Sequence, residues 1–180
     1  MGTTTALVTV QEFLQMPESE GLLEELIGGE VVSMPMCGQP HEVTKSNVIR
    51  VVTAWLLQNP VLRLFCEAAF QLDDLNCLIP DISLISSHRI VPGSTGVFQG
   101  APEIAIEVVS SEPAARLERK IRLYLAHRGK SVWTVFPQER LVRIYNTAGE
   151  SKSFQGDQPL TDSSVLPGFS VPASAIFEGV

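Results

Sequence analysis

The stretch from Glu103 to Val109, which reads EIAIEVV, decides the fold prediction for this chain. Side chains of a strand alternate between two faces, so Glu107 shares one face with Ala105 and Val109, and the residues between them share the other. Both faces are apolar, as is typical of a central strand that is covered on both sides. A buried ionised carboxylate is costly unless it is paired, hydrogen-bonded or bound to a metal. Glu107 therefore marks a candidate site.

A second acid lies in a similar apolar run, LIPDISLI, from Leu78 to Ile85. On a strand, Asp81 would share a face with Ile79 and Ser83. Carboxylate oxygens are the hard ligands that Mg²⁺ prefers, so two acids on neighbouring strands suggest a divalent-cation site. For each acid taken alone, a salt bridge or a strand-end cap is the more frequent arrangement.

A lysine follows on an amphipathic helix, which we expect from Pro113 to Arg128. Leu117, Ile121 and Tyr124 fall on one apolar face of this helix at 3.6 residues per turn. Lys120 lies at the edge of that face, where it could reach the acids and donate to a phosphate or to an attacking water. The alternative, a lysine that covers apolar surface with its alkyl chain, fits the spacing equally well.

The remaining elements are predicted from periodicity and from turn residues. We expect a short helix over 9–16, a hairpin over 26–34, a long helix over 41–58, strands over 62–71, 79–86 and 103–110, and a last hairpin over 131–136 and 141–145. This order predicts an α/β (α+β) fold with a mixed β-sheet flanked by helices. The chain has neither GxGxxG nor GxxxxGK[ST], so a phosphate-cradling loop is not supported.

Length and composition indicate one folded domain. The chain has 180 residues, of which 44% are hydrophobic and 18% charged. We expect a single domain over 1–180, with a core over about 20–146 and a polar, then apolar, C-terminal tail over 147–180. The net charge of −7 argues against indiscriminate nucleic-acid binding, although one segment is basic. Its cations are Arg116, Arg119, Lys120, Arg122 and Arg128.

The cysteines and histidines show no metal or disulfide spacing. Cys37, Cys66 and Cys77 are predicted to be small buried hydrophobic residues in a reducing cytosol. His41, which opens the long helix, could be a metal ligand or a phosphate donor, but an exposed or capping histidine is the more frequent arrangement at such a position. No segment has the length and hydrophobicity of a membrane span, and the start of the chain lacks the features of a signal peptide. We therefore expect a cytoplasmic protein without membrane contact.

Five motifs in a fixed order carry a resemblance to a known family. They are ELIGGE at 25–30, Pro80-Asp81, APEIAIEVVS at 101–110, KIRLY at 120–124 and VLPGF at 165–169. Over about 22–177 the chain resembles the Uma-type putative restriction endonuclease family of bacteria, within the PD-(D/E)XK nuclease superfamily. The resemblance implies a restriction-endonuclease-like core.

The resemblance also implies a set of site residues. Mg²⁺, with Mn²⁺ as a possible substitute, would be held by Asp81, Glu107 and the backbone carbonyl of Val108. Glu25 matches the family's early glutamate and would complete the metal shell. The bound ion would lower the pKa of an attacking water and stabilise the charge that develops on the phosphate.

The catalytic lysine is implied by the same resemblance. In the superfamily it normally stands two residues after the second acid, where this chain has Val109. In this family the role passes to the following helix, and hence to Lys120, which would hold or polarise the water. The implied function is a Mg²⁺-dependent endonuclease that acts on DNA, or alternatively on RNA.

Two other functions fit the sequence. The family usually has Asp before Pro137, where this chain has Phe136. This departure and the acidic net charge favour a catalytically inactive nuclease-fold protein that acts by binding or assembly. A third reading is a structural domain whose acids pair with the arginines of the 113–128 helix. In each case the apolar last hairpin and tail could also pack across a twofold axis in a homodimer.

Overall fold

A six-stranded mixed sheet forms the centre of the molecule. The structure is a computed structural model and describes residues 7–17, 22–34 and 36–180. The sheet order is β11-β10-β9-β8-β6-β3. Its strands are β3 (Leu62–Cys66), β6 (Ile82–Ser86), β8 (Ile104–Val108), β9 (Ser131–Phe136), β10 (Leu141–Asn146) and β11 (Ser151–Gln155). β8 is buried along its whole length, antiparallel to β6 and parallel to β9, which confirms the predicted central strand.

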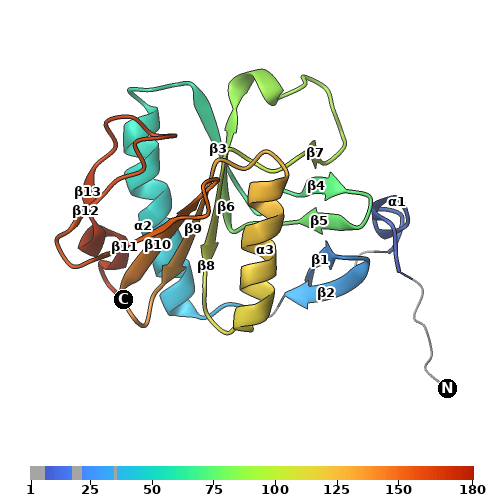
Figure 1. Cartoon of the computed structure of the whole chain (residues 1–180), viewed down its shortest axis with the longest axis horizontal. Coiled ribbons are helices and arrows are strands. Elements are labelled where there is room, and N and C mark those ends of the chain that lie inside the picture. The colour runs from blue at the N-terminus through green and yellow to red at the C-terminus, as the bar shows by residue number, and fades with distance from the viewer. Residues whose placement is uncertain (1–6, 18–21, 35) are drawn as a thin grey trace.

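The two faces of this sheet are covered by different elements (Figure 1). The helix α2 (Gln39–Leu56) and the C-terminal segment cover the face that carries Ile104 and Ile106. The helix α3 (Ala114–Ala126) and a second sheet cover the face that carries Ala105 and Glu107. The alternation of β8 therefore sends its apolar majority toward α2 and its acid toward α3. The mixed α+β class predicted from sequence is confirmed.

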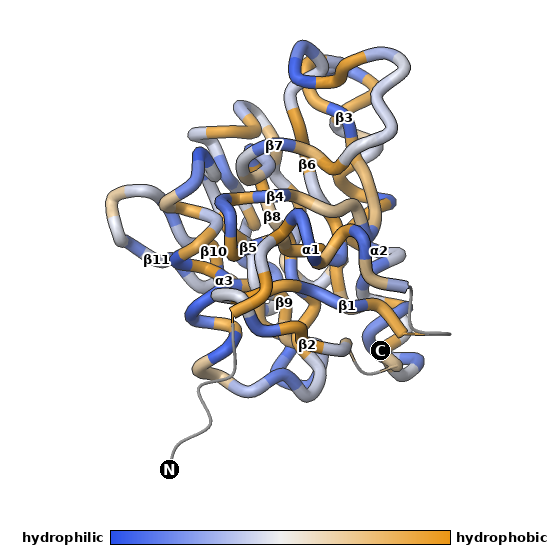
Figure 2. Tube along the Cα trace, turned by 90° about the vertical axis from the view of Figure 1, so that its right-hand side faces the viewer, coloured by the Kyte–Doolittle hydropathy of each residue, from blue (hydrophilic) through white to orange (hydrophobic). Residues whose placement is uncertain are grey.

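The second sheet is five-stranded, with the order β2-β1-β5-β4-β7. Its strands are β1 (Leu23–Ile27), β2 (Glu30–Met34), β4 (Phe70–Asp73), β5 (Asn76–Leu78) and β7 (Phe98–Gln99). The predicted hairpin is confirmed as β1 and β2, joined by Gly28 and Gly29 with φ of 62° and 78°. In Figure 2, β1 shows a hydrophilic stretch between two hydrophobic ones, because Glu24 and Glu25 interrupt its apolar residues.

The helices form where the sequence predicts them. α1 (Val10–Phe13) opens with the predicted capping box between Thr9 and Glu12. α3 ends where the Gly129 N–H donates to the Tyr124 carbonyl at 2.9 Å, and a Cβ at Gly129 would collide with that carbonyl. Among the described residues, no helix combines the length and the hydrophobicity needed to cross a membrane.

The strand predicted over 62–71 is wrong. The segment divides into β3 and β4, which belong to different sheets. The break falls at Glu67, whose φ of 52° lies in the left-handed region that non-glycine residues seldom adopt. The Glu67 N–H donates to the Asp81 carbonyl at 3.3 Å, a contact between distant segments. No glycine or proline marks this break, so local sequence did not reveal it.

The C-terminal segment is an integral part of the core. β11 extends the central sheet, followed by β12 (Pro159–Leu160), β13 (Val171–Pro172) and the 3₁₀ helix η2 (Ala173–Phe177). Leu166 and Phe169 are buried in the same cluster as α2. Trp133 donates its indole N–H to the Asp162 carboxylate at 2.8 Å, which ties this segment to β9.

The prediction for the cysteines is confirmed only for Cys77, which is buried. Cys37 and Cys66 are exposed, contrary to the prediction. Cys37 belongs to the stretch between β2 and α2, and Cys66 ends β3 where the chain leaves the central sheet. At both positions the chain runs over the surface, so these two side chains do not enter the core.

Candidate functional site

Glu107 projects from β8 toward α3 and is only 3% exposed. Lys120 Nζ lies 2.9 Å from both carboxylate oxygens of Glu107. Tyr124 Oη donates to Glu107 Oε1 at 2.8 Å. Lys120 and Tyr124 stand four residues apart on α3, so one face of the helix supplies both donors. The carboxylate is thus held by an ammonium and a hydroxyl.

Glu25 enters the same cluster from β1. It is completely buried, and its Oε1 accepts the Ile79 N–H at 2.6 Å and lies 3.1 Å from Lys120 Nζ. Its Oε2 is buried without a hydrogen-bond partner among the described residues. Three segments far apart in sequence therefore bring Glu25, Glu107 and Lys120 together. Lys120 is 0% exposed, deeper than the helix-edge position predicted from its spacing.

This cluster contains more acid than base, and the pKa values reflect it. Burial raises the pKa of Glu107 to about 8, with Lys120 opposing the shift and Glu25 adding to it. Burial also acts to lower the pKa of Lys120, but Glu107 and Glu25 outweigh it and hold that pKa above its ordinary value. Both shifts favour the protonated form, because burial disfavours the ionised carboxylate of Glu107 and several carboxylates surround the one ammonium. An additional positive charge would therefore stabilise the ionised carboxylates of this cluster.

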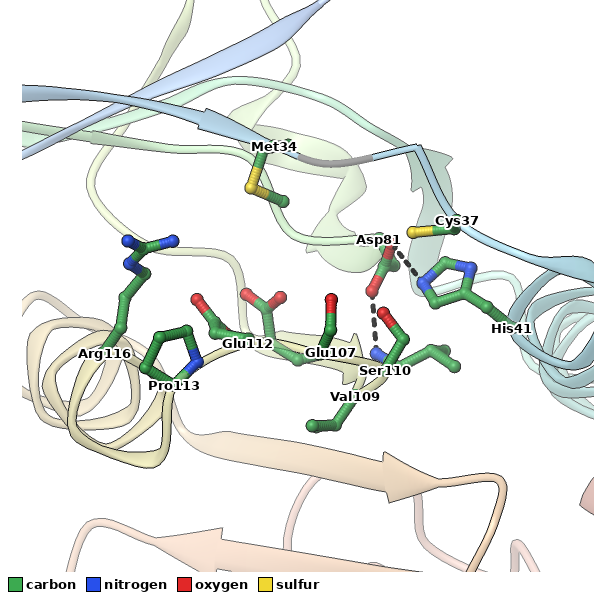
Figure 3. Close-up of a pocket in the computed structure, with 12 residues that line it drawn as sticks. Met34, Cys37, His41, Asp81, Glu107, Val109, Ser110, Glu112, Pro113 and Arg116 are labelled. Carbon is green, nitrogen blue, oxygen red and sulfur yellow. Dashed lines mark hydrogen bonds and ion pairs between the residues drawn. The ribbon is translucent and has the colours of Figure 1, made fainter.

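Asp81 reaches the end of β8 from the neighbouring segment. It directly precedes β6, instead of lying within a strand as predicted. Its Oδ2 accepts the Val108 N–H at 2.7 Å, and its Oδ1 lies 3.1 Å from His41 Nε2 (Figure 3). Asp81 is thereby fixed to the residue that follows Glu107. The structure thus places all four predicted side chains and Val108 around one end of β8.

His41 lies at the site, although the sequence analysis favoured an exposed or capping histidine over a ligand. It is 3% exposed, contrary to the favoured arrangement. Its Nδ1 lies 3.0 Å from Glu42 Oε1, so the ring is held between two carboxylates. Burial acts to lower the pKa of His41, but Asp81 and Glu42 outweigh it and raise that pKa. His41 therefore orients Asp81, and its raised pKa favours the protonated ring that pairs with both carboxylates.

A signal for His41 existed in the sequence. The buried residues of α2 are His41, Thr44, Val48, Val51 and Val52. They form one stripe at helical spacing, so extending the apolar face of the helix backwards from Val48 reaches His41. The histidine occupies a buried position of the helix, and its charge is balanced by contacts from other segments.

A small cavity opens onto these acids. It has a volume of about 70 Å³ and its lining includes Met34, Cys37, His41, Asp81, Glu107 and Glu112 (Figure 3). This volume holds several waters or a hydrated ion, since one water needs about 10–15 Å³ by the same measure. Burial raises the pKa of Glu112, and its Oε1 is buried without a partner among the described residues. Glu112 was missed, because nothing in its local sequence distinguishes it.

The donor chemistry suits a hard divalent cation, but the side chains do not form a finished coordination shell. Within residues 7–17, 22–34 and 36–180, no three His, Cys, Asp or Glu side chains gather in a way that could hold a metal ion. The oxygens of Asp81 and Glu107 accept protein hydrogen bonds instead. Glu25 and Glu112 each have a buried oxygen without a hydrogen-bond partner among the described residues, and the cluster has more carboxylates than cations. Both features nevertheless suit a divalent cation that prefers oxygen ligands.

The cations of the basic segment on α3 lie in different surroundings. Lys120 is buried, and Arg122 pairs with Glu118 at 2.8 Å. Of its arginines, Arg116 lines the cavity beside the acids. The positive charge of this helix is thus divided between the interior, a surface ion pair and the cavity mouth.

Comparison with known proteins gives two matches. The sequence model of a family described as Uma2, putative restriction endonuclease, matches residues 10–174. The fold is similar to the crystal structure of a putative nuclease belonging to DUF820 from Anabaena variabilis ATCC 29413, with a TM-score of 0.85 and 25% sequence identity. That match covers 95% of this chain and 98% of the other. No curated protein sequence matches the chain.

Proposed function

Because the chain belongs to the Uma2 family of putative restriction endonucleases, we propose that it is a metal-dependent endonuclease that hydrolyses phosphodiester bonds of nucleic acid, with DNA as the first substrate to test. One observation carries the proposal. Glu107, Lys120 and Glu25 form a buried cluster beside Asp81, at a cavity of about 70 Å³. A buried acid whose pKa is raised by burial and by neighbouring carboxylates, in a cluster that borders a cavity, is a candidate for a functional site.

Mg²⁺ or Mn²⁺ would be held by Asp81, Glu107 and the carbonyl of Val108, with Glu112 available at the cavity wall. A divalent ion bound there supplies a water of lowered pKa and stabilises the developing charge on the phosphate. Asp81 would have to exchange the His41 contact for this role, or Glu107 the contact with Lys120 or Tyr124. The surplus of carboxylate supports the exchange, since it leaves the site short of positive charge.

Lys120 has two functions in this proposal. In the metal-free arrangement it holds Glu107 in place, with Glu25 on its other side at 3.1 Å. If Glu107 held a metal ion instead, the ammonium of Lys120 would be free to donate to the attacking water or to a phosphate oxygen. Glu25 keeps the ammonium in position, because its Oε1 is itself anchored by the Ile79 N–H. His41 positions Asp81 through the contact of 3.1 Å between His41 Nε2 and Asp81 Oδ1.

A cleavage assay tests the proposal. Plasmid and single-stranded DNA, and RNA, are incubated with the protein and millimolar Mg²⁺ or Mn²⁺. We expect cleavage that disappears in Asp81→Asn and in Glu107→Gln, and that persists in the control Glu178→Gln. Glu178 is an exposed acid that follows η2, pairs with Arg50 at 2.8 Å and does not line the cavity. Undiminished cleavage by both site variants would refute the proposal.

A second function is favoured by the closed state of the cluster. Lys120 has no exposed surface, and the described residues contain no ready metal-binding group. A nuclease-fold protein that acts by binding or assembly would have these properties. Calorimetric titration with Mg²⁺ and Mn²⁺ separates the two functions. Absence of binding at millimolar metal favours the second one.

Assembly and location are separate proposals. The tail residues that suggested a homodimer are covered within the chain, as the burial of Leu166 and Phe169 shows. Light scattering after size exclusion gives the oligomeric state directly. The cytoplasmic location stays a prediction from composition, to be checked by fractionation of the cells that produce the protein.

A further inference from the structure

A second hollow lies beside the site, between α3 and the central sheet. We name it the α3 groove. Its volume is about 460 Å³, and it is lined by Leu117, Ile121, Leu125, Phe136, Arg143 and Tyr145. Leu117 and Ile121 are buried and form its floor, whereas Phe136 and Tyr145 are partly exposed on the sheet side. Small-molecule sites commonly span about 300–1,000 Å³, so the groove has room for a ring system with a sugar.

The α3 groove adjoins the site cavity. Val109 and Glu112 line both hollows. Both residues belong to the segment between β8 and α3, so the chain that leaves the strand carrying Glu107 borders the two hollows. A ligand with two chemically different parts could therefore place one part in each hollow. A nucleotide, with a phosphate and a base joined by a sugar, is such a ligand.

The chemistry of the α3 groove favours the base over the phosphate. Its walls include two aromatic rings, Phe136 and Tyr145, and aliphatic side chains of α3. Aromatic rings bind unpaired bases by stacking, which requires no particular base. The rim carries the carboxylates of Glu112, Glu118 and Glu150 and the guanidinium groups of Arg122, which pairs with Glu118, and Arg143. The acids outnumber the cations, which disfavours a phosphate, and carboxylates accept hydrogen bonds from base amino groups.

We propose that the α3 groove binds an unpaired nucleobase of the strand whose phosphate enters the site cavity. This inference rests on the proposed function and narrows its substrate to single-stranded nucleic acid, or to a nucleotide turned out of a duplex. A base within a duplex is stacked and paired, so it cannot reach a groove between a helix and a sheet. The base would stack on Tyr145 or Phe136 and lie over the aliphatic floor.

A binding experiment without metal tests the inference separately from cleavage. Fluorescence anisotropy in EDTA is measured with end-labelled dodecamers: single-stranded DNA, single-stranded RNA, duplex DNA, and a wholly abasic strand of equal charge. We expect the better of the two single strands to bind at least about fivefold more tightly than the abasic strand and the duplex. The DNA and RNA strands show which sugar is preferred.

Variants locate the effect. Tyr145→Leu and Phe136→Leu should each weaken binding of the single strand by about fivefold or more, with binding of the abasic strand unchanged. Tyr145→Phe keeps the ring and should bind as the original protein does. Phe13→Leu is a matched control, because Phe13 lines a different hollow beside α1. Thermal unfolding of each variant shows whether it is folded.

The inference is overturned if the original protein binds the abasic strand as tightly as the strands with bases, a result that needs no variant. It is also overturned if both leucine variants are folded and keep the original affinity. Metal-dependent cleavage without base discrimination would refute the groove and leave the proposed nuclease function intact. Base discrimination without any cleavage would support the groove and contradict the nuclease function.

Discussion

Glu103 directly precedes strand β8, and Glu107 lies near its end. Both side chains are buried, but they differ in their charged partners and in the direction of their pKa shifts. They are 5% and 3% exposed. Glu103 Oε2 accepts the Ser86 N–H at 2.9 Å and lies 3.2 Å from Arg89 Nη1. Burial acts to raise the pKa of Glu103, but the Ser86 hydrogen bond and Arg89 outweigh it and lower that pKa. At Glu107 burial prevails and the pKa rises.

Charge balance explains the difference. Glu103 is the carboxylate that pairs with Arg89, whose guanidinium also donates to backbone carbonyls at 99–101. Glu107 shares Lys120 with Glu25, and Glu112 also acts on this ammonium. Burial of an acid is therefore a poor sign of function by itself. A buried acid in surplus over its cations, beside a cavity, is the better sign.

The substitution with the largest expected effect on stability is Lys120→Met, which removes the ammonium that faces Glu107 and Glu25. We expect a loss of about 3–5 kcal/mol in the free energy of unfolding, because buried carboxylates lose their charged partner. Denaturant titration measures it. The double variant Lys120→Met/Glu107→Gln should lose less than Lys120→Met alone, because one uncompensated charge is also removed.

Arg122→Met is the matched control on the same helix. Its ion pair with Glu118 is exposed on both sides, so we expect a change of at most about 0.5 kcal/mol. Equal losses of stability in Lys120→Met and Arg122→Met would show that Lys120 is not strongly coupled to the charges of Glu107 and Glu25.

Glu103→Gln tests the other end of the strand. The amide still fits the space but cannot pair as strongly with Arg89 or with the Ser86 N–H. We expect a loss of about 1–2 kcal/mol at pH 7, the range for hydrogen bonds to charged groups. Cleavage activity should remain, because Glu103 lies at the end of β8 away from the cavity. Loss of activity in a folded Glu103→Gln variant would contradict the division between the two acids.

Glu107→Gln should change the free energy of unfolding less than Glu103→Gln does, and in the opposite direction. Because Glu107 is in surplus, a neutral amide should leave the free energy of unfolding within about 1 kcal/mol of the original value, on the stabilising side at pH 9. The same variant should abolish cleavage. A destabilisation as large as that of Lys120→Met would show that Glu107 is mainly a structural partner of the lysine.

The pH dependence of stability gives the finest test. The pKa of Glu103 is lowered, so its contribution to the free energy of unfolding is present above pH 4.5, the ordinary pKa, and is lost as the pH falls through the pKa of the folded state. The pKa of Glu107 is raised, so its contribution to the free energy of unfolding is present below pH 4.5 and is lost as the pH rises toward about 8. The stability difference between the original protein and each Gln variant, measured from pH 3 to 9, should follow these opposite slopes.

Local pattern predicted much of the fold and part of the site. The apolar faces of β8 predicted a central strand, and the spacing on α3 placed Lys120 beside Tyr124. The strand patterns singled out Asp81 and Glu107 as acids of a candidate cation site, and the resemblance added Glu25 and the catalytic role of Lys120. The break at Glu67 could not be predicted, because its left-handed backbone depends on contact with the Asp81 segment.

The sequence alone determined most of the strands and helices and which acids stand in apolar surroundings, because these follow from the periodicity of side chains along the chain. Only the tertiary structure decided that Glu103 is balanced by Arg89, whereas Glu107 competes with Glu25 for one lysine. It alone revealed that His41 and Glu112 join the site. The charge of a buried acid depends on neighbours that come from distant segments, and no local pattern records them.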